Sequence, residues 1–471
     1  MQGVRVQDVV VIGAGMAGLL AAAALARDGR TVTLLDRDLL PDVPQPRPGV
    51  PQGRQPHLLL HRGLSAVEDL LPGFRDELQA AGAVAVDTGD LAWWGPPGWA
   101  PRARQLEVLL ASRPLVEHLV RRRVSALPGV RVVAAVRGAG LRRGEEGGPR
   151  WWVDTVEAGW ADTPDGGPGD ADGRHAWPAD LVVDASGRAS RLPVWLRALG
   201  LPAARVEEVD AHVGYATVRV RLPADALGAA GVVLLQQRGR GGGLALPAEG
   251  GWWTVTAVGA GALRPPRDLP GLRAYLAGLP DDALARVAAA GAVDGDVASH
   301  RQTGNRRHRY DRVRGWPDGL VAVGDALCAF DPVYGQGITV AALEAQALRA
   351  ADARGDLTAP GGAARLLREC VRLGAVPWRI ATGEDRALAG LPGPRSPVSA
   401  LAGRWIGELT RMAAHGDTVA QAGLSRVYHL VAPPTSLFRP SLLVRGLRAR
   451  LRGYGPPVPR PALLPVDEAD R

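Results

Sequence analysis

The sequence Val9-Val-Val-Ile-Gly13-Ala-Gly15-Met-Ala-Gly18 decides the fold of the N-terminal part of this 471-residue chain. The apolar, β-branched run at residues 9–12 predicts a buried strand, and the alanine- and leucine-rich segment at 19–26 predicts a helix. A second apolar run at 31–35 ends at Asp36. Together these segments predict a βαβ unit whose helix opens within the glycines.

Each glycine in this turn has its own physical reason. Gly13 allows the tight turn, Gly15 lets the backbone approach a pyrophosphate, and Gly18 lets helix and strand pack closely. The N–H groups at the start of the helix attract phosphate, and Asp36, which follows Gly18 by 18 residues, can accept hydrogen bonds from a ribose diol. The sequence therefore predicts a dinucleotide-binding site.

A second glycine-rich turn lies far along the chain, in Gly324-Asp325-Ala-Leu-Cys-Ala-Phe-Asp-Pro332-Val-Tyr-Gly335-Gln-Gly337. An apolar run at 319–323 precedes it and predicts a strand, while residues 336–353 predict a long helix. A helix start of this kind stabilises negative charge on a ligand, including that on a reduced isoalloxazine ring. We therefore expect this turn to face the same ligand as the first.

The composition narrows the classes of function. All 56 basic residues are arginine, and the absence of lysine excludes Schiff-base chemistry. The net charge is +8, but we expect the arginine runs at 121–123 and 306–309 to be solvated, so no nucleic-acid partner is predicted. Two cysteines and no recognisable signal peptide predict a reducing, cytoplasmic location.

The chain is long enough for two or three domains, and we expect an α/β fold. A Rossmann-type dinucleotide-binding domain is predicted from residues 1–85, 110–205 and 300–375. Alternating runs at 212–222, 232–237 and 252–258 predict an inserted antiparallel-sheet domain, formed by 86–109 and 206–299, that binds substrate. Residues 376–471 predict a helical C-terminal region, and residues 161–176 predict a loop.

The two glycine-rich turns together resemble those of FAD-dependent monooxygenases of the p-hydroxybenzoate hydroxylase fold. Within that family, the segments Gly49-Val-Pro-Gln-Gly-Arg54-Gln-Pro-His57, Ala111-Ser-Arg113 and Asn305-Arg-Arg-His-Arg-Tyr310-Asp are similar to those of bacterial tailoring epoxidases related to squalene epoxidase. The resemblance implies a pyrophosphate site, a ribose site, an adenine contact and a flavin-ring site. Its cofactor-binding residues are Gly13, Gly15, Gly18, Asp36, Arg37, Arg54, Arg113, Val136, Asp184, Gly324, Asp325, Pro332, Gly335 and Gly337.

The resemblance also implies the chemistry. Reduced FAD reacts with O2 to give a C4a-hydroperoxide, whose distal oxygen epoxidises an alkene, or hydroxylates a lipophilic natural-product intermediate. No catalytic acid or base is assigned, because the flavin carries the chemistry. Pro332 and Gly335 would line its ring. In the motif Asp184-Ala-Ser-Gly187, two residues separate Asp and Gly, which are adjacent in the related hydroxylases. The electron donor is therefore expected to be NAD(P)H, acting directly or through a separate flavin reductase.

The motifs admit four other functions. A flavin-dependent halogenase is disfavoured, because the chain lacks both the expected lysine and a Trp-x-Trp-x-Ile-Pro segment. A reductase of the geranylgeranyl reductase type would saturate double bonds without O2, and an aromatic hydroxylase would act on phenols. A non-catalytic nucleotide-binding protein would show no turnover with any reductant.

Several other sequence features have more than one interpretation. His57 and His61 could share a face of a helix at 57–71, where packing or flavin contact is favoured over metal binding. Arg54 is equally compatible with a solvated loop. The tryptophans at 93, 94, 99, 252 and 253 could line a substrate pocket or pack in a core. The basic segment 440–452 predicts a docked terminal helix, with peripheral membrane contact as the alternative.

Overall fold

The computed structural model describes residues 7–157, 173–222, 226–392 and 396–463. A five-stranded parallel sheet with the order β20-β12-β1-β2-β8 forms the core of its larger part. All four neighbouring pairs run parallel. The short connection across the glycines and the apolar runs on both sides produce the predicted βαβ unit. The strands are β1 (Asp8–Ile12), β2 (Thr31–Leu35), β8 (Val130–Val133), β12 (Leu181–Asp184) and β20 (Leu320–Ala322).

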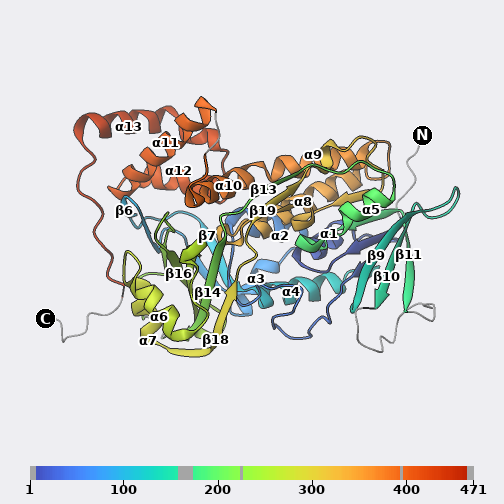
Figure 1. Ribbon diagram of the computed structural model, residues 1–471, viewed down its shortest axis with the longest axis horizontal. Coiled ribbons are helices and arrows are strands. Elements are labelled where there is room, and N and C mark those ends of the chain that lie inside the picture. Colours follow the sequence, from blue (N-terminus) through green and yellow to red (C-terminus); the bar gives the residue numbers. More distant parts are fainter. Residues whose placement is uncertain (1–6, 158–172, 223–225, 393–395, 464–471) are drawn as a thin grey trace.

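Helices cover one face of this sheet and a small antiparallel sheet covers the other (Figure 1). Helix α1 packs against α4 and α8, and α8 in turn packs against α2 and α9. The bounds are α1 (Met16–Leu25), α2 (His61–Leu70), α3 (Phe74–Ala80), α4 (Arg113–Ser125), α5 (Leu192–Ala198), α8 (Gly337–Ala353) and α9 (Gly362–Leu373). The opposite face carries β9 (Val136–Arg143), β10 (Trp151–Glu157) and β11 (Arg174–Ala179).

A seven-stranded sheet forms a second layer beside this core, in the order β18-β14-β17-β16-β15-β5-β6. Two of its strands come from near residue 95 and five from residues 213–300, and helices α6 and α7 pack on it (Figure 1). Its members are β5 (Leu91–Gly95), β6 (Gly98–Trp99), β14 (Val213–Arg221), β15 (Gly231–Leu234), β16 (Gly242–Ala248), β17 (Trp252–Ala260) and β18 (Ala292–His300), with α6 (Leu269–Ala277) and α7 (Ala283–Ala290).

Two three-stranded antiparallel sheets connect the layers. One has the order β3-β7-β4 and the other β13-β19-β21. Their strands are β3 (Pro56–Leu59), β4 (Val84–Asp87), β7 (Glu107–Ser112), β13 (Val206–Val209), β19 (Asn305–His308) and β21 (Cys328–Ala329). Strand β7 contacts both β16 of the seven-stranded sheet and helix α4 of the core, so its sheet bridges the two layers. The α/β fold class is therefore confirmed, while the domain boundaries stay a prediction.

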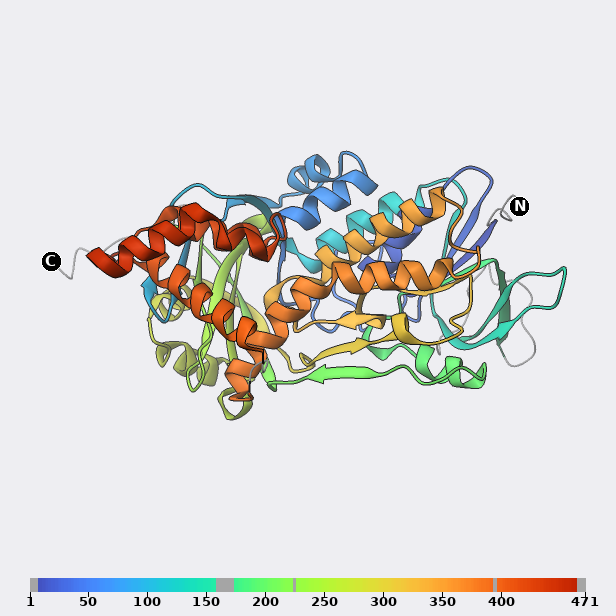
Figure 2. The same cartoon turned by 90° about the horizontal axis from the view of Figure 1, so that it is seen from above.

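Four helices form the C-terminal region, which has its own apolar cluster around Leu409, Met412 and Leu437. Figure 2 shows these helices extending away from the parallel sheet, over the end of the molecule that holds the seven-stranded sheet. No helix among the described residues is long and apolar enough to cross a membrane. The helices are α10 (Ala375–Ala389), α11 (Pro397–Ala414), α12 (Thr418–Tyr428) and α13 (Pro440–Arg452).

The structure corrects three local expectations. Residues 56–59 form β3, so His57 lies on a strand and does not share a helix face with His61. The valine-rich residues 130–136 also predict a single strand, but it is broken at Ala135, whose φ of 57° is left-handed. The predicted loop at 161–176 lies mostly outside the described residues, and residues 174–176 belong to β11.

The arginine runs are only partly solvated, contrary to expectation. The side chains of Arg121, Arg307 and Arg309 are 11–12% exposed. Arg307 and Arg309 both pair with Glu207, and Arg121 donates to the carbonyl of Pro41. Guanidinium groups satisfied in this way are not free to bind phosphates of a nucleic acid.

Candidate cofactor and substrate site

The first glycine turn is as tight as the sequence predicted. Gly13 has a φ of 101°, and a Cβ there would lie 2.5 Å from the carbonyl oxygen of Ala185. A Cβ on Gly18 would lie 1.8 Å from the carbonyl oxygen of Gly13. Both positions therefore require glycine, because the atoms in the way belong to backbone. Ala185 and Ser186 directly follow β12, so Gly13 packs against the loop at the end of the neighbouring parallel strand.

Gly15, by contrast, is not packed against other backbone. It lines a large cavity of about 1630 Å³. A Cβ there would meet only the guanidinium of Arg47, at 3.8 Å. Gly15 is also the N-cap of α1 and offers no side chain to cap the helix. Met16 and Ala17, in the first turn of α1, line the same cavity. An open helix start of this kind fits the pyrophosphate of a dinucleotide.

The acidic residue at the end of β2 is held in a buried network. Asp36 is 5% exposed and accepts hydrogen bonds from the backbone N–H of Ala14 at 2.7 Å and of Asp38 at 2.9 Å. The guanidinium of Arg47 lies 3.2 Å from Asp36 and 2.7 Å from Asp38. The third partner of Arg47 is Glu117 on α4, at 2.6 Å. This arginine therefore neutralises a set of three carboxylates behind the ribose position.

Glu117 links this network to the predicted pyrophosphate arginine. Its second oxygen accepts from Arg113 at 3.0 Å, one helical turn earlier on α4. Desolvation alone would raise the pKa of Glu117, but Arg113 and Arg47 lower it below its usual value. A serine two residues before Pro114 is typical of a helix N-cap, and Ser112 caps α4 by accepting from the N–H of Leu115. Arg113 lines the cavity, where its charge can face the phosphates.

The second glycine turn packs directly on the first. Gly324 has a φ of 58°, and a Cβ there would lie 2.6 Å from the Cβ of Ala17 on α1. The backbone N–H of Gly324 donates to Glu344 on α8 at 2.6 Å. Gly335, with a φ of 65°, and Gly337 both line the cavity, and a Cβ on either would meet nothing within 4 Å. Two helix starts far apart in the sequence therefore border the same space.

Glu344 lies behind this turn and is completely buried. Desolvation raises its pKa to about 8, although the hydrogen bond from Gly324 opposes the shift and Asp325 adds to it. The carboxyl group is therefore mainly protonated at neutral pH. A neutral acid at this position holds the turn without adding a second negative charge near Asp325.

Asp325 borders the cavity with its side chain one-third exposed toward it. Desolvation raises its pKa, while Arg188 is the largest opposing influence, with its guanidinium 3.4 Å away. Arg188 also donates to the carbonyl oxygens of Gly304 and Phe330. It therefore ties the loop after β12 to the loop that carries the second glycine turn.

The predicted cofactor residues divide into two groups. Most line one cavity of about 1630 Å³: Gly13, Gly15, Asp36, Arg37, Arg113, Val136, Gly324, Asp325, Pro332, Gly335 and Gly337. Gly18, Arg54 and Asp184 do not. Gly18 packs helix on strand, Arg54 is exposed on its loop, and the fully buried Asp184 accepts hydrogen bonds from Ser186 and Ser190. Ser186 and Gly187 line the cavity in place of Asp184.

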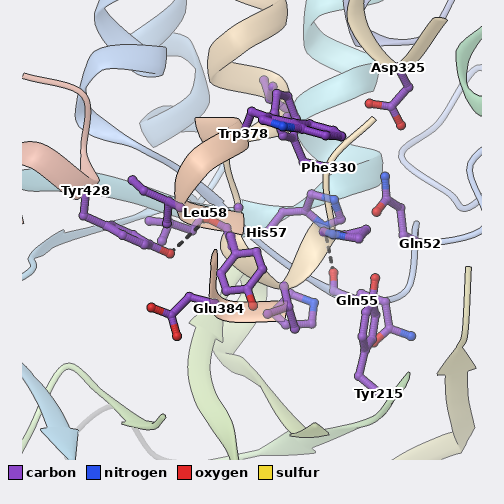
Figure 3. A pocket seen from close by; sticks show the side chains of 18 of the residues that line it. Gln52, Gln55, His57, Leu58, Tyr215, Asp325, Phe330, Trp378, Glu384 and Tyr428 are labelled. Atoms are coloured by element: carbon purple, nitrogen blue, oxygen red, sulfur yellow. Dashed lines mark hydrogen bonds between the residues drawn. The ribbon is translucent and has the colours of Figure 1, made fainter. Parts of the chain in front are cut away.

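The cavity continues from the glycine turns into a space between the seven-stranded sheet and the C-terminal helices (Figure 3). Apolar side chains from several elements line this continuation, among them Trp94, Leu246, Trp378 and Leu424. Of the five tryptophans considered, Trp93 and Trp94 line the cavity, while Trp99 and Trp253 pack in a core. A lipophilic molecule fits a space lined in this way.

His57 projects into this continuation from β3 (Figure 3). Its Nδ1 lies 2.9 Å from the carbonyl oxygen of Gln55, so Nδ1 carries the proton and Nε2 is left as an acceptor. Desolvation and the charge of Arg113 lower its pKa to about 3. No group of His, Cys, Asp or Glu side chains that could hold a metal occurs in the described part of the chain. His57 is therefore a neutral hydrogen-bond acceptor.

Other polar groups lie around the same space. Tyr215 is buried, its hydroxyl finds no hydrogen-bond partner among the described residues, and desolvation raises its pKa. Tyr334 donates to Asp385 at 2.9 Å, and Tyr428 donates to the carbonyl of Tyr334 at 2.9 Å. Desolvation raises the pKa of Asp385 to about 6. These contacts join α10 and α12 to the second glycine turn.

Sequence reasoning missed Arg47, Glu344 and Arg188. Arg47 lies in a proline-rich loop, where an arginine is ordinarily solvated, and Glu344 lies within an otherwise apolar helix. The one signal for Glu344 was its place on α8 among residues that must be buried. Its partner, Gly324, could only be found from the fold.

Comparison with known proteins agrees with this geometry. The family described as FAD dependent oxidoreductase matches residues 8–42, which span the first glycine turn. Protein Rv3254 of Mycobacterium tuberculosis is 33% identical over 350 residues, covering 73% of this chain and 72% of that protein.

Solved structures share the fold at low sequence identity. A probable FAD-dependent monooxygenase, PqsL from Pseudomonas aeruginosa, has a TM-score of 0.58 at 18% identity, covering 82% of this chain and 98% of its own. The p-nitrophenol 4-monooxygenase PnpA from Pseudomonas putida has a TM-score of 0.60 at 17% identity, covering 92% and 98%. The flavin-dependent brominase Bmp2 has a TM-score of 0.63 at 15% identity, covering 95% and 99%.

Proposed function

We propose that this chain, which belongs to the same family as Protein Rv3254 of Mycobacterium tuberculosis, is an FAD-dependent monooxygenase that transfers one oxygen atom from O2 to a lipophilic small molecule. The contact between Gly324 and Ala17 carries the proposal. It places two helix starts on one cavity, so that one helix can face the pyrophosphate and the other the flavin ring of a single cofactor.

The residues present fit FAD. Gly15 leaves room for a pyrophosphate, Arg113 offers a positive charge, and Asp36 ends β2 where a ribose would lie. Pro332, Gly335 and Gly337 would border the flavin ring, and Val136 the adenine. Bound FAD supplies the oxygen-transfer chemistry, whereas the protein binds it, orients the substrate and excludes water. The apolar lining of the cavity's continuation is suited to excluding water.

Epoxidation of an alkene is favoured over hydroxylation of a phenol. Oxygen transfer to a phenol benefits from removal of the phenolic proton, which requires a base with a pKa near the operating pH. His57 has a pKa of about 3 and is too weak for this task, and Asp385, with a pKa raised to about 6, is held by Tyr334 and Asn305 outside the cavity lining. Glu384, whose pKa is raised by burial, does line the cavity and is the base that the alternative reaction would use. Epoxidation needs no such base. A tailoring reaction on a polyene, as in epoxidases related to squalene epoxidase, is therefore the leading proposal, and aromatic hydroxylation is the alternative.

The electron donor is proposed to be NAD(P)H. The loop of Ser186 and Gly187 lines the cavity while Asp184 turns away from it, so the loop differs from the Asp-Gly pair of hydroxylases that bind NAD(P)H directly. Delivery through a separate flavin reductase is accordingly a second possibility. Anaerobic mixing of FAD-loaded protein with NADH or NADPH distinguishes the two, because direct reduction bleaches the flavin without any added reductase.

Oxygen-dependent consumption of reductant by the FAD-loaded protein tests the proposed function. We expect a panel of polyenes to accelerate consumption and to yield a product that is heavier by one oxygen atom. Faster consumption of reductant with a panel of phenols would instead support the alternative, aromatic hydroxylation. Saturation of a double bond in the absence of O2 would instead indicate a reductase of the geranylgeranyl reductase type. Oxygen uptake that no compound couples to product formation would contradict the monooxygenase assignment.

A further inference from the structure

Exposed apolar side chains are concentrated in the C-terminal helical region. Among the described residues, sixteen large apolar side chains are exposed, and nine of them lie between residues 398 and 451. Scattered exposed apolar residues need no explanation, but a concentration on one part of the surface does. The nine are Val398, Leu401, Ile406, Val419, Phe438, Leu443, Val444, Leu447 and Leu451.

Helix α13 presents an unpartnered apolar stripe. Leu443, Leu447 and Leu451 follow one another at intervals of four residues and are 44%, 59% and 77% exposed. This spacing places them on one face of the helix. The adjacent face, which carries Leu442 and Gly446, is buried, and a Cβ on Gly446 would lie 2.6 Å from the ring of Trp405. The packing is therefore satisfied on the inner face, and the stripe points outward.

Arginines border this stripe, and residues 439–452 contain no acidic residue. Arg445 and Arg450 turn toward the body, where they pair with Asp417 and Glu408. Arg448 and Arg452 each follow a leucine of the stripe by one residue. Figures 1 and 2 show α13 at the outer edge of the molecule. An apolar stripe flanked by arginine is the pattern of a helix that lies at a membrane surface.

The cavity reaches the neighbouring helix, α11. Ser399, Ala402 and Ile406 line it from one face of α11, and Ile406 is 43% exposed. Val398 and Leu401, which are 75% and 66% exposed, each precede one of these lining residues. The apolar cavity therefore reaches the surface at α11, among exposed apolar side chains of the same helical region.

We propose that the C-terminal helical region binds the surface of an anionic lipid bilayer through the leucine stripe and flanking arginines of α13. A second copy of the chain is disfavoured as the partner, because symmetric pairing of α13 would bring arginines together with no acidic residue on either helix. Docking also places the α11 end of the cavity near the bilayer, from which a lipophilic substrate can enter. This entry route rests on the proposed function, whereas the docking does not.

Co-sedimentation of the full-length, FAD-loaded protein with lipid vesicles tests the proposal. Vesicles of phosphatidylcholine mixed with phosphatidylglycerol should pellet the protein, and vesicles of phosphatidylcholine alone should pellet much less. The variant Leu443→Ser/Leu447→Ser/Leu451→Ser should lower the partition coefficient about tenfold or more, because three apolar side chains no longer enter the interface. Arg448→Gln/Arg452→Gln should lower it roughly tenfold to thirtyfold, on anionic vesicles only.

The matched control replaces three apolar residues that are exposed elsewhere, Val194→Ser/Val206→Ser/Leu263→Ser, and should bind as the unaltered protein does. Flavin absorbance and far-UV circular dichroism show that each variant is folded. Equal binding by the stripe variant and the control would overturn the proposal. So would a dimer in analytical ultracentrifugation that the stripe variant converts to monomer without any vesicle binding. Because vesicle binding needs no turnover, it can succeed even if the monooxygenase assignment fails.

Discussion

The two glycine turns both place a helix start at the cavity, but their local structures differ. The turn before α1 is shaped by local backbone packing, since both Gly13 and Gly18 face carbonyl oxygens at distances that no Cβ allows. The turn before α8 has open space at Gly335 and Gly337 and is held from behind by Glu344. A short motif is therefore enough to specify the first turn, whereas the second depends on groups that only the fold brings together.

Electrostatics differ in the same way. Behind the first turn, one buried arginine compensates Asp36, Asp38 and Glu117. Behind the second turn, no cation among the described residues pairs with Glu344, and the carboxyl group is instead mainly protonated at neutral pH because its pKa is raised to about 8. The first solution depends on a charge pairing and the second on a bound proton. The two should therefore respond oppositely to mutation and to pH.

The largest expected effect is the loss of Arg47. The substitution Arg47→Gln removes the buried cation shared by Asp36, Asp38 and Glu117, although Glu117 keeps its ion pair with Arg113. It should lower the free energy of unfolding by about 3–5 kcal/mol. The control, Arg54→Gln, removes an exposed arginine of the same loop and should change it by less than about 0.5 kcal/mol. Urea denaturation measures both. Equal free energies of unfolding for the two variants would show that Arg47 does not stabilise the buried carboxylates.

Alanine substitutions at the two turns should change the free energy of unfolding in opposite directions. Gly18→Ala drives a Cβ into the backbone of Gly13 and should destabilise the protein by at least about 1–3 kcal/mol. Gly337→Ala meets nothing within 4 Å and should stabilise the cofactor-free protein by up to about 1 kcal/mol, because alanine favours helix. Thermal unfolding without FAD measures this, and a loss in both variants would contradict the contrast.

Glu344 should make stability fall as pH rises. Its pKa is about 8 in the folded protein and about 4.5 when unfolded, so between these values the unfolded chain binds fewer protons. This group alone should cost about 1.4 kcal/mol between pH 6 and pH 7. Glu344→Gln keeps an acceptor for Gly324 and should abolish the slope. Glu369→Gln, on neighbouring α9, should leave it intact.

His57 should act on the acid side with the opposite sign. Its pKa is lowered to about 3 by desolvation, against about 6.5 when unfolded, so stability should fall as pH drops below 6.5. The loss should be about 1 kcal/mol between pH 6 and pH 5. Denaturation of His57→Gln at these two values should show a smaller difference. An unchanged difference would mean that another group carries the acid sensitivity.

The sequence predicted what local patterns encode. The βαβ unit, the Ser112 cap of α4 and the cofactor turns follow from residues close together in the chain. His57 was misplaced on a helix, because an apolar run beside polar residues fits either period until pairing with β7 decides it. Arg47 and Arg307 were missed as buried groups, since their partners are distant in the sequence. Long-range charge compensation leaves no short-range signature.

The central claim is that both glycine turns hold one FAD, and titration of cofactor-free protein with FAD tests it most directly. The account predicts one FAD per chain, and a large loss of affinity in both Gly15→Val and Gly337→Val. Both positions face the cavity with free space, so the cofactor-free variants should fold, with changes in the free energy of unfolding of about 1 kcal/mol or less from the helix-end preferences. A protein that binds no FAD, or one whose affinity falls in only one of these variants, would contradict it.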